Sequence, residues 1–165
     1  MTPELVIRQA VREDARAIID AHHAAVREKA VEHYSPEIIA AWAPEEVTEA
    51  RVQRLEEQIE SGEFHTLVAE TGGDIIGFGQ VNPQSGALGA VYVRKNPLGG
   101  VGERILSQLV HHARERGAKF LAMEASLNSE AFYRRNGFKT TGYGKHRIGA
   151  AGIDMACVHM MMKLG

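Results

Sequence analysis

The chain has 165 residues, of which 44% are hydrophobic and 24% are charged, with a formal net charge of -2 and a single cysteine, Cys157. This length and apolar content predict one folded domain over residues 1–165 and exclude a disordered chain. A charge near zero disfavours nucleic acid as a partner, and one cysteine excludes an internal disulfide and a Cys-rich zinc site.

The first residues lack the basic-then-apolar layout of a signal peptide. No apolar run approaches the roughly 20 residues that span a bilayer. We therefore expect a cytoplasmic protein that does not contact a membrane.

The first sixty or so residues are predicted to form one strand and two or three helices. Residues 4–10 alternate like a strand, and apolar residues over 15–26 recur at helical spacing. Ser35 followed by Pro36 is typical of a helix start. A further helix is expected to begin at Pro44 and to end at Gly62.

All 17 glycines lie at Gly62 or beyond, which predicts a remainder rich in turns and strands. The expected elements there are strands over 64–70, 75–81 and 87–94, a helix that ends at Gly117, a strand over 119–125, a short helix over 128–135, and strands over 138–147 and 153–163. This order predicts an α/β (α+β) fold, with a mixed, twisted sheet of about seven strands and helices on both faces.

A glycine-rich loop within residues 91–104 joins a predicted strand to a predicted helix and contains Gly99, Gly100 and Gly102. Glycines at such a junction let backbone N–H groups converge on an anion at the helix N-terminus. A P-loop needs Lys and then Ser or Thr after the glycines, and a Rossmann turn needs a glycine where Ile105 stands. The P-loop and the Rossmann turn are therefore disfavoured. Taken alone, the loop is either an anion-binding site of another kind or a turn that binds nothing.

Two motifs in this order resemble the GCN5-related N-acetyltransferase (GNAT) family. Gly100-Val101-Gly102 matches the end of the family's Q/R-x-x-G-x-G/A pyrophosphate loop, and residues 128–138 contain Asn-x-x-Ala-Phe-Tyr followed by Asn-Gly-Phe. Pro97 stands where the family usually has Gln or Arg. This departure removes one expected side-chain contact but leaves the backbone amides in place.

The resemblance implies direct transfer of an acetyl group from acetyl-CoA to an amine of a small molecule, in a ternary complex without a metal. Acetyl-CoA is then expected between strands 87–94 and 119–125, which splay apart in the family. Homodimerisation is also considered. The residues implied in cofactor binding are Val91, Tyr92, Val93, Leu98, Gly99, Gly100, Val101, Gly102, Glu103, Asn128, Ala131, Phe132 and Tyr133.

Tyr133 matches the tyrosine that protonates the leaving CoA thiolate in many family members, so it is the implied general acid. Asn128 is implied to bind the pantetheine arm, and it is also a candidate N-cap. The base that takes the proton of the amine is left open between Glu124, His22, His23 and a water relay. Cys157 is expected to be buried, which disfavours an acetyl-cysteine mechanism.

The helices of the first half resemble a bacterial branch of the family whose substrates are mostly unassigned. His22, Tyr34 and Trp42 on these helices are the candidate substrate-binding residues. The acceptor pocket is expected between residues 22–42 and 138–163. Two alternatives remain: acetylation of a protein lysine or N-terminus, and a non-catalytic acyl-CoA-binding or sensing module, which has no need of a proton donor.

Overall fold

The computed structural model describes residues 4–165. The elements are β1 (Leu5–Gln9), the 3-10 turn η1 (Arg12–Asp14), α1 (Ala15–Lys29), α2 (Pro36–Trp42), α3 (Glu49–Ser61), β2 (His65–Thr71), β3 (Asp74–Asn82), β4 (Ala87–Val93), α4 (Val101–Glu115), β5 (Phe120–Ser126), η2 (Leu127–Ser129), α5 (Glu130–Arg135), β6 (Lys139–Ile148) and β7 (Ile153–Lys163). Their order and type confirm the predicted α/β fold class.

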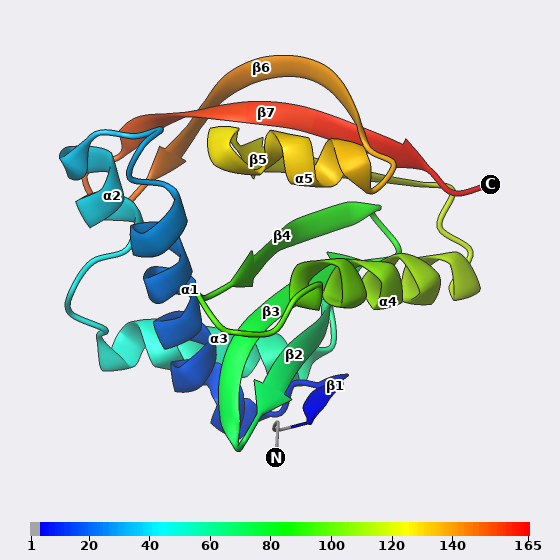
Figure 1. Ribbon diagram of the computed structural model, residues 1–165, viewed down its shortest axis with the longest axis horizontal. Coiled ribbons are helices and arrows are strands. Elements are labelled where there is room, and N and C mark those ends of the chain that lie inside the picture. The colour runs from blue at the N-terminus through cyan, green and yellow to red at the C-terminus, as the bar shows by residue number, and fades with distance from the viewer. Residues whose placement is uncertain (1–3) are drawn as a thin grey trace.

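The strands form one seven-stranded sheet in the order β1-β2-β3-β4-β5-β7-β6 (Figure 1). Only β4 and β5 pair in parallel, and the other neighbours are antiparallel. The β2–β3 hairpin closes at Gly72 and Gly73, both at positive φ, as a two-residue primed turn requires. The predicted mixed sheet is confirmed.

Helices cover both faces of β2–β4 because the buried side chains of these strands alternate between two cores. Leu67 and Ala69 on β2 belong to the core under α4, whereas Val68 between them packs with Ile18 and Ile19 of α1. Figure 1 shows α4 in front of these strands and α3 behind them. One face therefore meets α4, and the other meets α1 and α3.

The sheet divides between β4 and β5. These strands share one registered pair, Ala87 with Ala122, supported by a 2.8 Å bond from Ala122 N–H to the Gly86 carbonyl. By contrast, β5 stays paired with β7 along its whole length. The strands thus form two half-sheets, β1–β4 and β5–β7–β6, that meet at a single point of backbone pairing.

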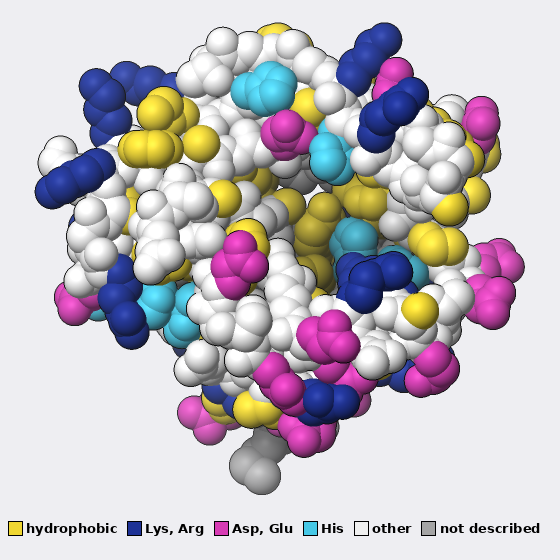
Figure 2. Space-filling view, turned by 180° about the vertical axis from the view of Figure 1, so that it is seen from behind, with side chains coloured by type: hydrophobic (Ala, Val, Ile, Leu, Met, Phe, Trp, Pro, Cys, Tyr) yellow, Lys and Arg dark blue, Asp and Glu magenta, His cyan; other side chains and the backbone are white. Residues whose placement is uncertain are grey.

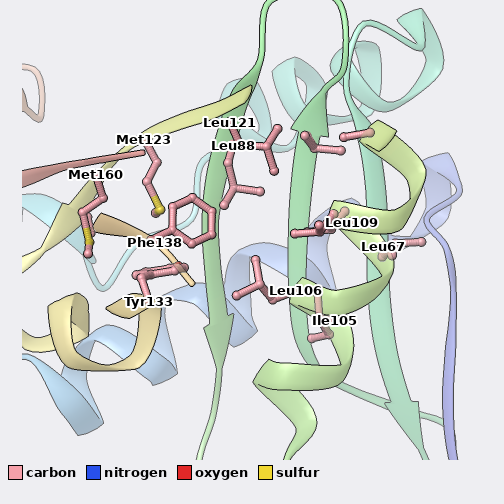
Figure 3. Close-up of a cluster of buried hydrophobic side chains, with 14 of the residues drawn as sticks. Leu67, Leu88, Ile105, Leu106, Leu109, Leu121, Met123, Tyr133, Phe138 and Met160 are labelled. Carbon is pink, nitrogen blue, oxygen red and sulfur yellow. The ribbon is translucent and has the colours of Figure 1, made fainter. Parts of the chain in front are cut away.

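Side chains hold the two half-sheets together where the backbone does not. Figure 3 shows Tyr133 and Phe138 from one half pointing into the same core as Leu88 and Leu106 from the other. This core lies on the α4 and α5 side of the sheet. The opposite side of the division is therefore left to α1, α2 and the loops.

Two element boundaries differ from those predicted. Helix α3 begins at Glu49 rather than Pro44, because Thr48 Oγ1 accepts the Arg51 N–H at 3.2 Å and so caps the helix. The short helix expected over 128–135 is the turn η2 followed by α5. Among residues 4–165, no helix is both long and apolar enough to cross a membrane.

Candidate active site

A cleft of about 800 Å³ lies at the division between β4 and β5. One wall is the end of β4 with the loop that leads into α4, and the facing wall is η2 with the start of α5. The C-terminal end of α1 and Trp42 complete the lining. The cleft therefore occupies the place where the parallel strands part.

Strand β4 presents backbone groups that the ladder with β3 does not use. The register between the two strands shifts at Phe78–Gln80, so that Gly79 alone faces both Ala90 and Val91. Val91 N–H donates to the Tyr133 hydroxyl at 2.8 Å, and the Val93 carbonyl accepts from Lys29 Nζ. Side chains from elsewhere thus occupy positions that a ligand's amides would take.

The loop before α4 forms an open backbone cradle. Gly100, the N-cap, has φ of 74° and gives no side-chain cap, and the Gly100 carbonyl accepts its intrahelical bond from Arg104 N–H at 3.1 Å. The N–H groups of the first turn, residues 101–103, therefore have no helical partner. A Cβ at Gly99 or Gly100 would meet no atom within 4 Å. This arrangement fits a bound pyrophosphate.

One predicted amide of the cradle is already engaged. Leu98 N–H donates to Asn96 Oδ1 at 2.8 Å, so this N–H supports the loop rather than an anion. Glu103 lies in the first helical turn and is exposed at the cleft, where its carboxylate repels phosphate and only its amide is suited to bind.

Asn128 has the chemistry expected of a pantetheine ligand. It lines the cleft, and its Oδ1 is buried without a hydrogen-bond partner among the described residues. It does not cap α5, whose N-cap is Ser129. A buried amide oxygen without a donor is costly in a folded protein. A ligand N–H in the cleft would satisfy it, so the residues present fit CoA.

Tyr133 is fully buried at 0% exposure, with its ring against Phe132 and Phe138. Its hydroxyl accepts the Val91 N–H, and no hydrogen bond in the described structure uses its own proton. Burial raises the pKa of this phenol, so it stays protonated at neutral pH. A proton is thus held directly beside the unpaired stretch of β4.

The end of α1 contributes residues that the sequence analysis did not identify. Lys29 is partly desolvated, and this burial lowers the pKa of its ammonium. Its neighbour Glu28 accepts the Lys95 N–H at 2.9 Å, which ties α1 to the loop before α4. No local motif signals these roles, because they depend on where the helix ends in space.

Glu124, the candidate base, lies on β5 but does not line the cleft. Its side chain is exposed, and Oε2 lies 2.9 Å from His146 Nδ1 on β6. Ser126, two residues further along the same strand, does reach the cleft. Glu124 therefore lies outside the lining of the cleft, two residues from Ser126, and its carboxylate is open to solvent.

The three candidate substrate residues have different surroundings. The His22 ring lies 4.3 Å from the Tyr92 ring and 6.3 Å from that of Trp42, centre to centre, and its Nε2 is buried without a partner among the described residues. Burial, more than the nearby charges of His23 and Arg51, lowers the pKa of His22 to about 3.

Tyr34 joins distant parts of the chain. Its hydroxyl donates to the Ala156 carbonyl at 2.6 Å and accepts the Leu127 N–H at 2.8 Å. Both bonding directions of the hydroxyl are thus taken by backbone, and the role that the structure gives Tyr34 is to connect the α1–α2 loop to β7 and η2.

The cleft brings together most of the predicted cofactor residues but not all. Gly99, Ala131 and Tyr133 do not line it, and Trp42 is the one candidate substrate residue that does. Ala131 is exposed on α5. Tyr133 is not part of the lining, but its hydroxyl accepts the Val91 N–H of β4.

A family model described as an acetyltransferase (GNAT) domain matches residues 30–159. No curated protein matches the chain. A solved GCN5-related N-acetyltransferase from Rhodopseudomonas palustris is 26% identical, over 99% of this chain and 97% of its own, with a TM-score of 0.83.

Two further solved structures are similar over nearly their whole length. PaiA N-acetyltransferase from Thermoplasma acidophilum, solved in complex with coenzyme A, is 19% identical over 97% of this chain and 99% of its own, with a TM-score of 0.75. Ribosomal-protein-alanine N-acetyltransferase from Brucella melitensis is 29% identical over 96% and 99%, with a TM-score of 0.68.

Proposed function

The chain belongs to the GNAT acetyltransferase family, and on this premise we propose that it moves an acetyl group from acetyl-CoA directly to an amine of a small molecule, within a ternary complex. The observation that carries the proposal is the cleft at the divided sheet, with uncapped helix amides at one end and the Tyr133 proton at the other. We also propose that residues 1–165 form a single N-acetyltransferase domain.

The chain's own groups account for binding of the donor. The amides of residues 99–103 would hold the pyrophosphate at the start of α4, where the helix dipole also favours negative charge. The groups of β4 outside the ladder with β3, which side chains now occupy, and Asn128 Oδ1 would pair with the pantetheine amides, as a strand edge pairs with a peptide. Acetyl-CoA supplies an acetyl group activated as a thioester.

Two groups serve the reacting atoms. Val91 N–H already donates to an oxygen, the Tyr133 hydroxyl, and the same N–H would stabilise negative charge on the thioester oxygen. As the amine nitrogen forms its bond to the acetyl carbon, the carbon–sulfur bond breaks, and Tyr133 would give its proton to the departing sulfur.

The proton lost by the amine needs a separate acceptor. An alkyl ammonium has a pKa near roughly 10.4, and His22, whose pKa is about 3, holds a proton too weakly to take that role. Glu124 is better suited because its carboxylate is exposed and can pass a proton to solvent. We assign Glu124 as the candidate base, directly or through water.

Direct transfer is favoured over an acetyl-enzyme route by the state of the only thiol. Cys157 is buried on β7, and burial raises the pKa of its thiol. A thiol that remains protonated is a poor nucleophile.

A second candidate acceptor is the N-terminal amine of a protein, favoured by the similarity to ribosomal-protein-alanine N-acetyltransferase. Peptide and small-amine acceptors are told apart in one assay. The thiol released from acetyl-CoA is measured with panels of each, and turnover with peptides alone would replace the small-molecule assignment.

Thermal unfolding tests the proposal first. Acetyl-CoA should raise the Tm of the protein by binding the folded state alone, whereas ATP and NAD should not. A shift with ATP or NAD and none with acetyl-CoA would overturn the assignment. A shift with acetyl-CoA but no thiol release with any amine or peptide would favour the non-catalytic acyl-CoA-binding module.

A further inference from the structure

Arg51, in the first turn of α3, is a half-buried cation that has no carboxylate partner. Arg8 and Arg51 are the only arginines within residues 4–165 that are not exposed. Arg8 pairs with Asp14 and Glu70, both at 2.8 Å. No carboxylate of the described residues lies within 4.0 Å of Arg51, and its side chain makes no hydrogen bond there. Burying a charge without a partner is unfavourable.

The groups that face Arg51 add no negative charge to it. Burial, and then the positive charges nearby, lowers the pKa of both His22 and His23 on α1, so both rings are neutral at pH 7. Arg54, on the same helix, is a second cation and is exposed. Asp20 faces His23 but lies more than 4.0 Å from the guanidinium. The surroundings of Arg51 are therefore positively charged, and no facing side chain of residues 4–165 neutralises this charge.

Helix α3, which carries Arg51, packs against α1, which carries His22, and His22 in turn contacts aromatic side chains beside the cleft. His22 packs against Tyr92 and Phe78, with ring centres 4.3 Å and 6.2 Å away, and Tyr92 with Trp42 lines the cleft. His22 Nε2 is buried, without a partner among the described residues. Figure 2 shows the face opposite to that of Figure 1 hollowed near its centre, with hydrophobic side chains at the floor and with histidine, basic and acidic side chains around it.

The chemistry of the positive group indicates what kind of anion it would bind. A guanidinium presents parallel N–H donors that match the two oxygens of a carboxylate. At the start of α3, Arg51 is the partly buried charge, because the facing His22 and His23 are neutral; the partly desolvated Lys29 lies at the C-terminal end of α1. A carboxylate of one negative charge balances Arg51, whereas a phosphate of about two charges at pH 7 would not be neutralised.

We propose that Arg51 anchors a carboxylate on the acceptor, so that the acceptor is an amino acid or another amine that bears a carboxylate, and not a simple amine or polyamine. The carboxylate lies at Arg51, and the apolar part of the acceptor lies along His22 and Tyr92 toward the cleft. This inference rests on the proposed acetyltransferase function, and it adds the class of acceptor.

Matched acceptor pairs test the class directly. Thiol release from acetyl-CoA is measured with tyrosine and tyramine, tryptophan and tryptamine, phenylalanine and phenethylamine, 4-aminobutyrate and butylamine, and lysine and cadaverine. At least one carboxylate-bearing member should be the better substrate of its pair. The same compounds are tested for a Tm shift in the presence of CoA, which reports binding without turnover.

The variant Arg51→Gln should lose about 30-fold or more in kcat/KM for the preferred carboxylate substrate, mostly through KM. Its activity toward the partner amine without a carboxylate should be unchanged. Arg51→Lys, which keeps the charge but not the paired donors, should recover part of the loss. Arg54→Gln, an exposed arginine on the same helix, is the matched control and should behave as the wild type.

Three results would overturn the inference: equal use of both members of every pair, an equal response of Arg51→Gln and wild type, or neither turnover nor a Tm shift with any acid in the panel. The acetyl-CoA-induced Tm shift separates this failure from that of the proposed function. Retention of that shift with any of these results contradicts Arg51 as the anchor, whereas its absence contradicts the proposed function. The Tm of Arg51→Gln without ligand should not fall, since no native partner is lost.

Discussion

At the scale of single residues, the important feature of the Tyr133 hydroxyl is that it accepts its one hydrogen bond and, within the described residues, donates none. It accepts from Val91 N–H at 2.8 Å and keeps its own proton free. Tyr133→Phe keeps the buried ring, so the cofactor Kd should be unchanged, while kcat should fall about 100-fold through loss of the general acid. Turnover and calorimetric binding of acetyl-CoA check the two effects separately.

The control for this substitution is Tyr143→Phe, which removes a hydroxyl from a side chain that is 67% exposed. Its kcat should match the wild type. If Tyr133→Phe also turns over normally, Tyr133 is not the proton donor, and its hydroxyl serves only to hold Val91.

His22 makes stability depend on pH. Its pKa is about 3 in the folded protein, against 6.5 for an unperturbed histidine, because burial disfavours the charged ring. The unfolded chain therefore binds a proton at this site before the folded chain does. Stability is full above pH 6.5 and falls as the pH decreases from 6.5 toward 3. His23 and Arg51 from α1 and α3, and Tyr92 from β4, are the ionisable groups that face it.

His22→Leu should remove this dependence. Between pH 6.5 and 5 the wild type should lose about 2 kcal/mol more than the variant, as measured by urea unfolding at the two pH values. His33→Leu, at an exposed position, controls for loss of a histidine as such. Identical losses in wild type and His22→Leu would show that His22 is not held neutral.

At the scale of elements, the loop before α4 contains a residue at positive φ within the proposed phosphate-binding cradle. Gly100 has φ of 74°, whereas Gly99 is not at positive φ, and neither would place a Cβ near another atom. Gly100→Ala should therefore cost about 1–2 kcal/mol of stability through conformation alone. Gly99→Ala should cost little.

Charge at the same position should act on the ligand. Gly100→Glu places a carboxylate in the cradle, so it should abolish the acetyl-CoA-induced Tm shift, while Gly100→Ala retains a shift. The comparison separates strain from electrostatic repulsion. A normal shift in Gly100→Glu would place the phosphates elsewhere.

The elements were largely predictable from local signals, and the exceptions have local causes. The β2–β3 hairpin follows from Gly72 and Gly73, and the start of α2 follows from Ser35, whose side chain accepts the Ile38 N–H at 3.3 Å. The start of α3 was misplaced because a Pro was favoured over the true cap, Thr48. Local signals fix where elements begin and end, since caps and turns act within a few residues.

At the scale of the whole molecule, Tyr34 connects parts that are far apart in the chain. Its hydroxyl bonds Ala156, 122 residues away, and Leu127, 93 residues away. Tyr34→Phe leaves two backbone groups without their partner, so the free energy of unfolding should fall by about 2 kcal/mol or more. Urea unfolding measures it, with Tyr143→Phe as the exposed control; no loss would mean that water replaces the hydroxyl.

Such long-range contacts explain why the site was only partly predictable. The loop glycines and Tyr133 could be named because a motif of fixed spacing carries them. Lys29 and Arg51 could not, because their roles depend on which helix ends and faces meet in space. The same limit hides the unpartnered oxygen of Asn128, whose neighbours come from several elements.

The divided sheet also affects the tendency of the protein to aggregate through strand edges. A strand edge with free N–H and C=O groups attracts strands of other molecules and promotes aggregation. Here the edge of β4 that faces away from β3 lies in a cleft walled by α1 and η2 rather than on the outside of the sheet. Of the two outer edges, β6 carries Lys139, Lys145 and Arg147, charges that discourage pairing. The β4 edge, which would bind the ligand, is thus set inside a cleft, where it is less accessible to other chains than an outer strand.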